Sequence, residues 1–178
     1  YYDFKKKALG LDELHLYDVY APIITSFGKS YSFEEAKELV MKSLSILGDD
    51  YVEILNRAFD ERWIDVYNNV GKRSGGYSSG GYDTKPYILL NYEGKFNDVS
   101  TLAHELGHSM HSYFSIKNNP YHEYQYKIFV AEVASTVNEL LLSYYMYDNT
   151  NDKKEKMNIL NQRLELFRAT ISVSYTHL

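Results

Sequence analysis

Apolar residues recur at helical spacing in five segments of the chain, several of them bounded by residues that favour helix ends. Ser32 and Glu35 form a capping-box pattern, and Asp152 and Glu155 mark another helix start. The run 118–120 contains a proline, which cannot continue a helix, and ends the helix before it. Helices are therefore expected over about residues 33–47, 48–69, 97–117, 126–147 and 152–169.

Two segments between these helices have other patterns. Five glycines fall from Gly71 to Gly81, interleaved with serine and tyrosine, and this composition predicts a loop rather than a helix or a regular strand. The run from Pro86 to Tyr92 is short, apolar and led by proline, which favours a strand at the edge of a sheet. The chain is therefore expected to be mainly α-helical with a small β-element.

The composition narrows the class of protein. With 178 residues, 44% of them hydrophobic, and a net charge of −5, the chain is long and apolar enough for one folded domain. Its acidic balance argues against a nucleic-acid partner, and no apolar stretch reaches the ~18 residues of a membrane span. There is no cysteine, which excludes disulfides, thiolate metal sites and cysteine nucleophiles. The same absence fits a cytoplasmic location.

Candidate chemistry lies in the helix expected over 97–117. His104, Glu105 and His108 form the pattern H-E-x-x-H. Two histidines four residues apart on a helix lie about 40° apart around its axis and ~6 Å along it, so both rings can bind one metal ion. Glu105 is rotated by about 100° from His104 and can act as a general base toward a water on that ion. The apolar residues of this helix cluster on the opposite side, at Val99, Leu102, Leu106, Met110 and Tyr113.

A third metal ligand has to come from another segment. His111 and Phe114 stand where the long metzincin motif needs glycine and histidine, so that class is excluded. Glu132 and Glu139 share one face of the next long helix but lie about 10.5 Å apart along it, so only one of them can bind the ion. Spacing alone does not choose between them. The small neighbours of Glu132 favour it, because they allow close packing against the His104 helix, and Glu139 would then accept a hydrogen bond from a ligand histidine or simply line the cleft.

The remaining signals around this helix are weaker. Gly107 lies in mid-helix, where glycine costs up to ~1 kcal/mol, so a packing or functional reason is expected. His111 faces the same side as His104, and either a role at the site or a structural hydrogen bond would explain it. His15, His122 and His177 have no partner at ligand spacing and are expected to be structural or exposed.

Two longer stretches carry a family resemblance. The run from His104 to Ser115 and the run from Phe129 to Glu139 resemble oligoendopeptidase F, the bacterial branch of the thimet oligopeptidase family of zinc peptidases. Segments 15–20, 80–83 and 86–92 are similar to other parts of that family, so the resemblance covers about residues 1–170.

The resemblance implies a zincin-like metallopeptidase fold, of which this chain would hold part of the catalytic core. By resemblance, His104, His108 and Glu132 bind one Zn²⁺ per chain, and Glu105 is the base and proton shuttle. The implied partners are short, unstructured peptides.

The sequence thus predicts a zinc-dependent endopeptidase that hydrolyses internal bonds of short peptides. Members of the resembled family are several times longer, so residues 1–171 are expected to be a partial catalytic domain and 172–178 a truncated or non-native tail. The alternative is a zinc-binding fragment without turnover, because the family's further substrate and oxyanion residues would lie beyond residue 178.

Overall fold

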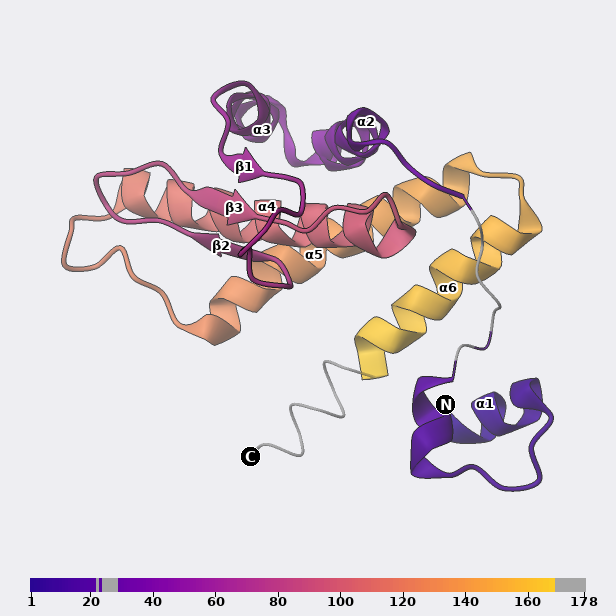
Figure 1. The fold of residues 1–178 in the computed structure, drawn as a ribbon. Helices are drawn as coiled ribbons and strands as arrows, with labels where there is room; N and C mark the ends of the chain where they lie inside the picture. The colour runs from indigo at the N-terminus through magenta and orange to yellow at the C-terminus, as the bar shows by residue number, and fades with distance from the viewer. Residues whose placement is uncertain (22, 24–28, 169–178) are drawn as a thin grey trace. The chain divides into compact units, whose positions relative to one another are not determined.

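The computed structural model describes residues 1–21, 23 and 29–168, which form two compact units (Figure 1). The larger unit runs from Lys29 to Met146 and holds the whole H-E-x-x-H pattern. The smaller unit combines the described parts of residues 1–28 and 147–178.

Helices dominate the larger unit, and three short strands form a small sheet. Its elements in chain order are α2 (Phe33–Leu44), a 3₁₀ turn (Ser45–Leu47), α3 (Asp49–Asp60), β1 (Ile64–Asp65), β2 (Tyr77–Ser79), β3 (Tyr87–Leu89), α4 (Phe96–Asn118) and α5 (Ile128–Asn149), the end of which belongs to the smaller unit. The predicted fold class, mainly α with a small β-element, is confirmed.

Side chains cap these helices much as the sequence predicts. The Ser32 hydroxyl accepts from the backbone N–H of Glu35 at 3.2 Å, and the Glu35 carboxylate accepts from the backbone N–H of Ser32 at 2.7 Å. Helix α4 has Lys95 at its N-cap, and the Asp98 carboxylate accepts from the backbone N–H of Lys95 at 2.9 Å. The helix α4 ends at Asn118, at the start of the segment predicted to stop it.

The prediction of one helix over residues 48–69 is wrong in its second half, because α3 ends at Asp60. Arg62 adopts φ 57°, a left-handed conformation that interrupts the helical hydrogen bonds. Trp63 then becomes buried, and Ile64 and Asp65 form β1 instead. The apolar spacing predicted a helix here because a short buried strand and the apolar face of a helix use the same kinds of residue.

Two expectations about the sheet are also wrong. Strand β3 pairs in parallel with β1 and antiparallel with β2, so it is the central strand and not an edge. Pro86 precedes the paired residues and therefore removes no hydrogen bond from the ladder. The glycine-rich segment is not loop throughout, since it contributes β2 at Tyr77–Ser79, which pairs with Tyr87–Leu89.

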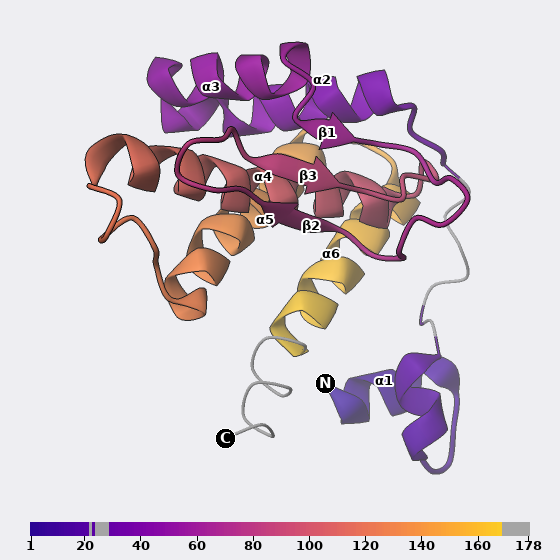
Figure 2. The same ribbon diagram turned by 60° about the vertical axis from the view of Figure 1, so that its left-hand side comes forward.

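The larger unit packs around α4, with the sheet, α2 and α3 against it (Figure 1, Figure 2). The apolar face predicted for this helix is confirmed: Val99, Leu102 and Leu106 are fully buried, and Met110 is nearly so. Trp63 and Ile88 from the sheet region are buried in the same unit. This core holds α4 by its apolar face and leaves the face with the histidines available for the site.

The smaller unit contains α1 (Tyr2–Leu9), a 3₁₀ turn (Leu16–Tyr20) and α6 (Lys153–Phe167). The Asp152 carboxylate caps α6 by accepting from the backbone N–H of Lys154 at 2.8 Å. Lys5 is buried, and its ammonium group donates to the backbone carbonyl of Val19.

The domain boundaries stay a prediction for residues 1–171, and the tail expected at 172–178 lies outside the described residues. Among the helices that the structure describes, none is long and apolar enough to cross a membrane.

Candidate metal centre

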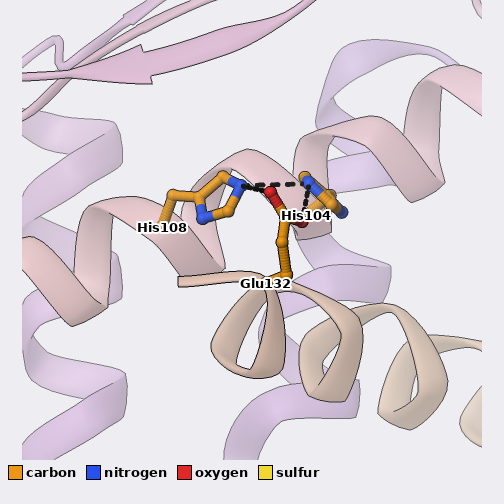
Figure 3. A group of neighbouring side chains, drawn as sticks. All are labelled: His104, His108 and Glu132. Carbon is orange, nitrogen blue, oxygen red and sulfur yellow. Dashed lines mark hydrogen bonds and ion pairs between the residues drawn. The ribbon is translucent and has the colours of Figure 1, made fainter. Parts of the chain in front are cut away.

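His104 and His108 on α4 meet Glu132 on α5 (Figure 3). The Nε2 atoms of the two histidines are 3.1 Å apart. One carboxylate oxygen of Glu132 lies 3.5 Å from Nε2 of His104, and the other lies 3.8 Å from Nε2 of His108. The structure therefore brings together the three residues that the sequence nominates as ligands.

Their spacing suits one tetrahedral metal ion. Ligand atoms placed about 2.0–2.1 Å from a tetrahedral centre lie roughly 3.3 Å from one another. Here the two Nε2 atoms are 3.1 Å apart, and one ligand atom from each of the three residues lies within 4.8 Å of the others. A movement of the Glu132 carboxylate toward the histidines would bring one of its oxygens to the tetrahedral separation from both rings. Two imidazoles and a carboxylate form a donor set suited to zinc, with a fourth position left for water or substrate.

Gly107 lets the two helices approach closely. A Cβ atom at this position would lie 2.6 Å from Cα of Ser135 and 2.9 Å from the carbonyl oxygen of Ala134. Because both atoms belong to the backbone, they cannot swing aside, and the crossing requires glycine. Ser135 is fully buried at this contact, and its hydroxyl donates to the backbone carbonyl of Glu132 at 3.0 Å. The close crossing is what presents Glu132 to α4.

Glu139 orients the ring of His104. Its carboxylate accepts a hydrogen bond from Nδ1 of His104 at 2.5 Å, and the Ser100 hydroxyl donates to the same carboxylate at 3.4 Å. With the proton on Nδ1, Nε2 keeps its lone pair for a metal ion. Burial alone would lower the pKa of His104, but the hydrogen bond to Glu139 and the surrounding carboxylates raise that pKa above its ordinary value.

The ring of His108 has a different environment. Burial lowers the pKa of His108, and the neighbouring His104 lowers it further. A hydrogen bond to the backbone of Ala131 acts in the opposite direction on this pKa. His108 is therefore held in its neutral form, which is the form that binds a metal.

A buried amide beside Glu139 is a feature that sequence reasoning missed. The Nδ2 group of Asn138 donates to the carbonyl of Ala103 at 3.2 Å, and its Oδ1 accepts from the Tyr51 hydroxyl at 3.0 Å. Asn138 thereby links α3, α4 and α5 at the residue before His104. The signal in the sequence is an asparagine directly before Glu139.

Glu105 is buried, with 6% of its surface exposed, and it lies outside the three-residue cluster. Burial raises the pKa of its carboxyl above the ordinary value, while the charge of His104 acts in the opposite direction. A buried carboxyl group with a raised pKa next to a metal site has the properties of a general acid or base.

The other histidines lie outside the cluster. His111 stacks on Tyr126, with ring centroids 3.8 Å apart, and its Nδ1 is buried with no hydrogen-bond partner in the described part of the chain. His15 and His122 are exposed, as expected, and His177 lies outside the described residues.

A mainly helical fold with a small sheet and a paired-histidine helix is that of a zincin-like protein. The comparison with protein families agrees, because the sequence profile of Peptidase family M3 matches residues 1–176. The chain belongs to this family.

Individual relatives are similar over the same region. The chain is 50% identical over 171 residues to oligopeptidase PepF of Bacillus subtilis, which covers 96% of this chain and 26% of that protein. It is 53% identical over 154 residues to an oligoendopeptidase F homolog of Borreliella burgdorferi, covering 85% and 26% of the two chains.

Solved structures have the same fold. A crystal structure from Chlamydophila abortus matches with a TM-score of 0.83 and 49% identity, covering 96% of this chain and 28% of that one. Oligoendopeptidase-F from Enterococcus faecium matches with a TM-score of 0.58 and 27% identity, covering 95% and 22%. The chain thus spans about a quarter of the length of the relatives it matches.

Proposed function

We propose that this chain carries the zinc site of a metalloendopeptidase that cleaves short peptides. In this proposal His104, His108 and Glu132 hold one Zn²⁺, and Glu105 is the catalytic base. The observation that carries the proposal is the convergence of two Nε2 atoms and one carboxylate at separations of 3.1, 3.5 and 3.8 Å. The names of the relatives, oligopeptidase and oligoendopeptidase, support the same substrate class.

The residues divide the chemistry between them. When bound, zinc supplies Lewis-acid polarisation of the scissile carbonyl and of the attacking water. Glu105 takes a proton from that water as the oxygen bonds to the carbonyl carbon, and then delivers it to the amine nitrogen as the C–N bond breaks. The burial that raises the pKa of Glu105 favours its accepting the proton and holding it until the amine leaves. Glu139 keeps His104 in the tautomer with Nε2 free.

Glu105→Gln tests the assigned base. The variant keeps the shape of the side chain but cannot accept a proton, so zinc content should remain at one per chain while turnover of short peptides falls by about 10²–10⁴-fold. Glu123→Gln, at an exposed position outside the cluster, is the matched control and should change neither quantity. Undiminished turnover in the Glu105→Gln chain would refute the role.

A zinc-binding piece without turnover is the second candidate. The observation that favours it is coverage, because the chain spans 26% of the length of PepF. Donors for the developing oxyanion, each worth about 3–4 kcal/mol where one has been removed, would then lie in the rest of a longer protein.

Zinc addition to the purified chain, followed by metal analysis and an assay with a quenched fluorescent peptide, separates the two candidates. One zinc per chain with cleavage supports the endopeptidase, and one zinc without cleavage supports the second candidate. A chain without stoichiometric zinc contradicts both. The cytoplasmic location and the absence of nucleic-acid and membrane partners stay predictions.

A further inference from the structure

Helix α4 places Glu105 against the segment that enters β2. A Cβ atom at residue 76 would lie 3.4 Å from Oε1 of Glu105, 3.5 Å from its Cγ and 2.9 Å from Cγ2 of Thr101. The space that a side chain would fill at residue 76 is therefore bordered by Thr101 and the side chain of Glu105. An alanine at this position would have to displace Thr101 or the segment itself, because 2.9 Å is shorter than any relaxed carbon–carbon contact.

Ser78 adds polar contacts on the same side of α4. Its backbone hydrogen-bonds the Glu105 carboxylate, and its hydroxyl lies 2.7 Å from the hydroxyl of Ser109. Ser109 is fully buried and comes four residues after Glu105, so the hydroxyl pair ties β2 to the turn of α4 that carries the carboxylate. The pairing of Ser78 with Ile88 anchors the segment to the central strand.

We propose that the Gly76–Ser78 segment is a positioning element for Glu105. The inference rests on the proposed function, in which Glu105 moves the proton. Gly76 supplies a wall that limits the side chain, and the Ser78 backbone supplies a polar partner for its carboxylate. The candidate zinc ligand Glu132 is positioned by α5 instead, through the Gly107–Ser135 crossing. Helix α4 carries both Glu105 and the two histidines, but the segment borders Glu105, whereas Glu132 depends on α5. A change in the segment should therefore affect proton transfer without affecting metal binding.

Gly76→Ala tests this separation in the zinc-loaded chain. A segment that shifts to relieve the clash with Thr101 also moves away from the Glu105 carboxylate. The loss of this positioning should lower kcat by about 10–100-fold, while KM and zinc affinity stay within about twofold of wild type. Gly81→Ala is the matched control on the other side of β2, because a Cβ there meets only Oγ1 of Thr84, at 3.7 Å. An unchanged kcat in Gly76→Ala, or a loss of zinc affinity as large as the loss of kcat, would overturn the inference.

The amide proton of Ser78 provides a readout that needs neither zinc nor turnover. In the ¹⁵N-labelled chain, Glu105→Gln removes the charged acceptor and should move the Ser78 amide resonance upfield. Gly76→Ala should move it in the same direction, and Gly81→Ala should leave it in place. A Ser78 amide that does not respond to Glu105→Gln overturns the positioning role. A chain that binds no zinc contradicts only the proposed function, because the Ser78 amide resonance detects the contact between Ser78 and Glu105 in the absence of metal.

Ser109→Ala is the alternative test if Gly76→Ala does not fold, because it removes the hydrogen bond between the Ser78 and Ser109 hydroxyls without adding an atom. It should lower kcat, keep KM and zinc affinity, and speed hydrogen exchange at the Ser78 amide. Ser78→Thr keeps a hydroxyl and suits a strand, so it is the conservative variant that should retain both kcat and slow exchange. Wild-type kcat and exchange in Ser109→Ala would contradict the inference.

Discussion

Helices α4 and α5 have nearly the same length, 23 and 22 residues, yet they differ in how many large apolar residues they leave exposed. Helix α4 buries its apolar face and carries the histidines on the other side. Helix α5 instead buries Ser135 and Asn138 against α4 and directs Glu132 and Glu139 toward the histidines. It leaves large apolar residues exposed, namely Phe129, Val130, Val133, Val137 and Tyr144.

This contrast shows that the buried side of α5 combines polar residues, Ser135 and Asn138, with the apolar residues Ala131, Leu142 and Met146. A rule that places only apolar residues on the inward face of a helix would miss Ser135 and Asn138. The inward polar groups are tolerated because they are paired, Asn138 with Ala103 and Tyr51, and Ser135 with Glu132. Leaving one such buried group unpaired would cost about 1–3 kcal/mol.

Removing a carboxylate from the inward face of α5 is expected to have the largest effect. Glu132→Ala should empty the proposed zinc site, whereas Glu139→Ala should weaken zinc binding by about 10–100-fold, because Glu139 contacts the ring of a proposed ligand, His104, and is not a proposed ligand itself. Chelator competition and metal analysis of both purified variants measure this. Retention of zinc in Glu132→Ala with complete loss in Glu139→Ala would reverse the two assignments.

The crossing between the helices comes next. Gly107→Ala places a Cβ 2.6 Å from Cα of Ser135, so the free energy of unfolding should fall by about 1–3 kcal/mol, although alanine is the better helix former. Zinc affinity should fall as well, because Glu132 moves with α5. Urea unfolding and zinc titration check both. Because the clash is with backbone, adding Ser135→Ala should not restore either quantity, and a restoration would contradict this explanation.

A smaller effect is expected from Tyr51→Phe, which removes one hydrogen bond to the inward face of α5. The free energy of unfolding should fall by about 0.5–1.5 kcal/mol at neutral pH. Burial raises the pKa of Tyr51 from 10.0 to about 12. The wild-type contribution is therefore complete below pH ~10 and is lost as the pH rises toward about 12. The difference between wild type and variant should shrink over that range in unfolding experiments, and a constant difference would contradict the burial of the hydroxyl.

The outward face of α5 should give the smallest effect. Val133→Ser changes a residue that is 52% exposed, so the free energy of unfolding should change by less than about 0.5 kcal/mol. Val137→Ser, one turn further on the same face, should behave in the same way. A larger loss, or a change in sedimentation that accompanies it, would show that this face is covered in solution and would weaken the contrast with α4.

Local chemistry was sufficient for much of the fold. The caps at Ser32 and Asp152 and the stop after α4 depend on neighbouring residues, and they were predicted within a few positions. The segment after α3 was not, because Trp63 and Ile64 suit a helix face and a strand equally well. The sequence also does not predict the central position of β3, because its partners β1 and β2 come from two other segments of the chain.

At the site, the sequence by itself determined that His104 and His108 point to one place, because a helix sets the angle and rise between residues four apart. It also indicated that Gly107, a glycine in the middle of a helix, has a packing or functional role. The tertiary structure alone decided which glutamate of α5 approaches both Nε2 atoms and which one takes the Nδ1 proton of His104. The physical reason is that two rigid helices can present different residues to each other, and the choice depends on the backbone contact at which they cross.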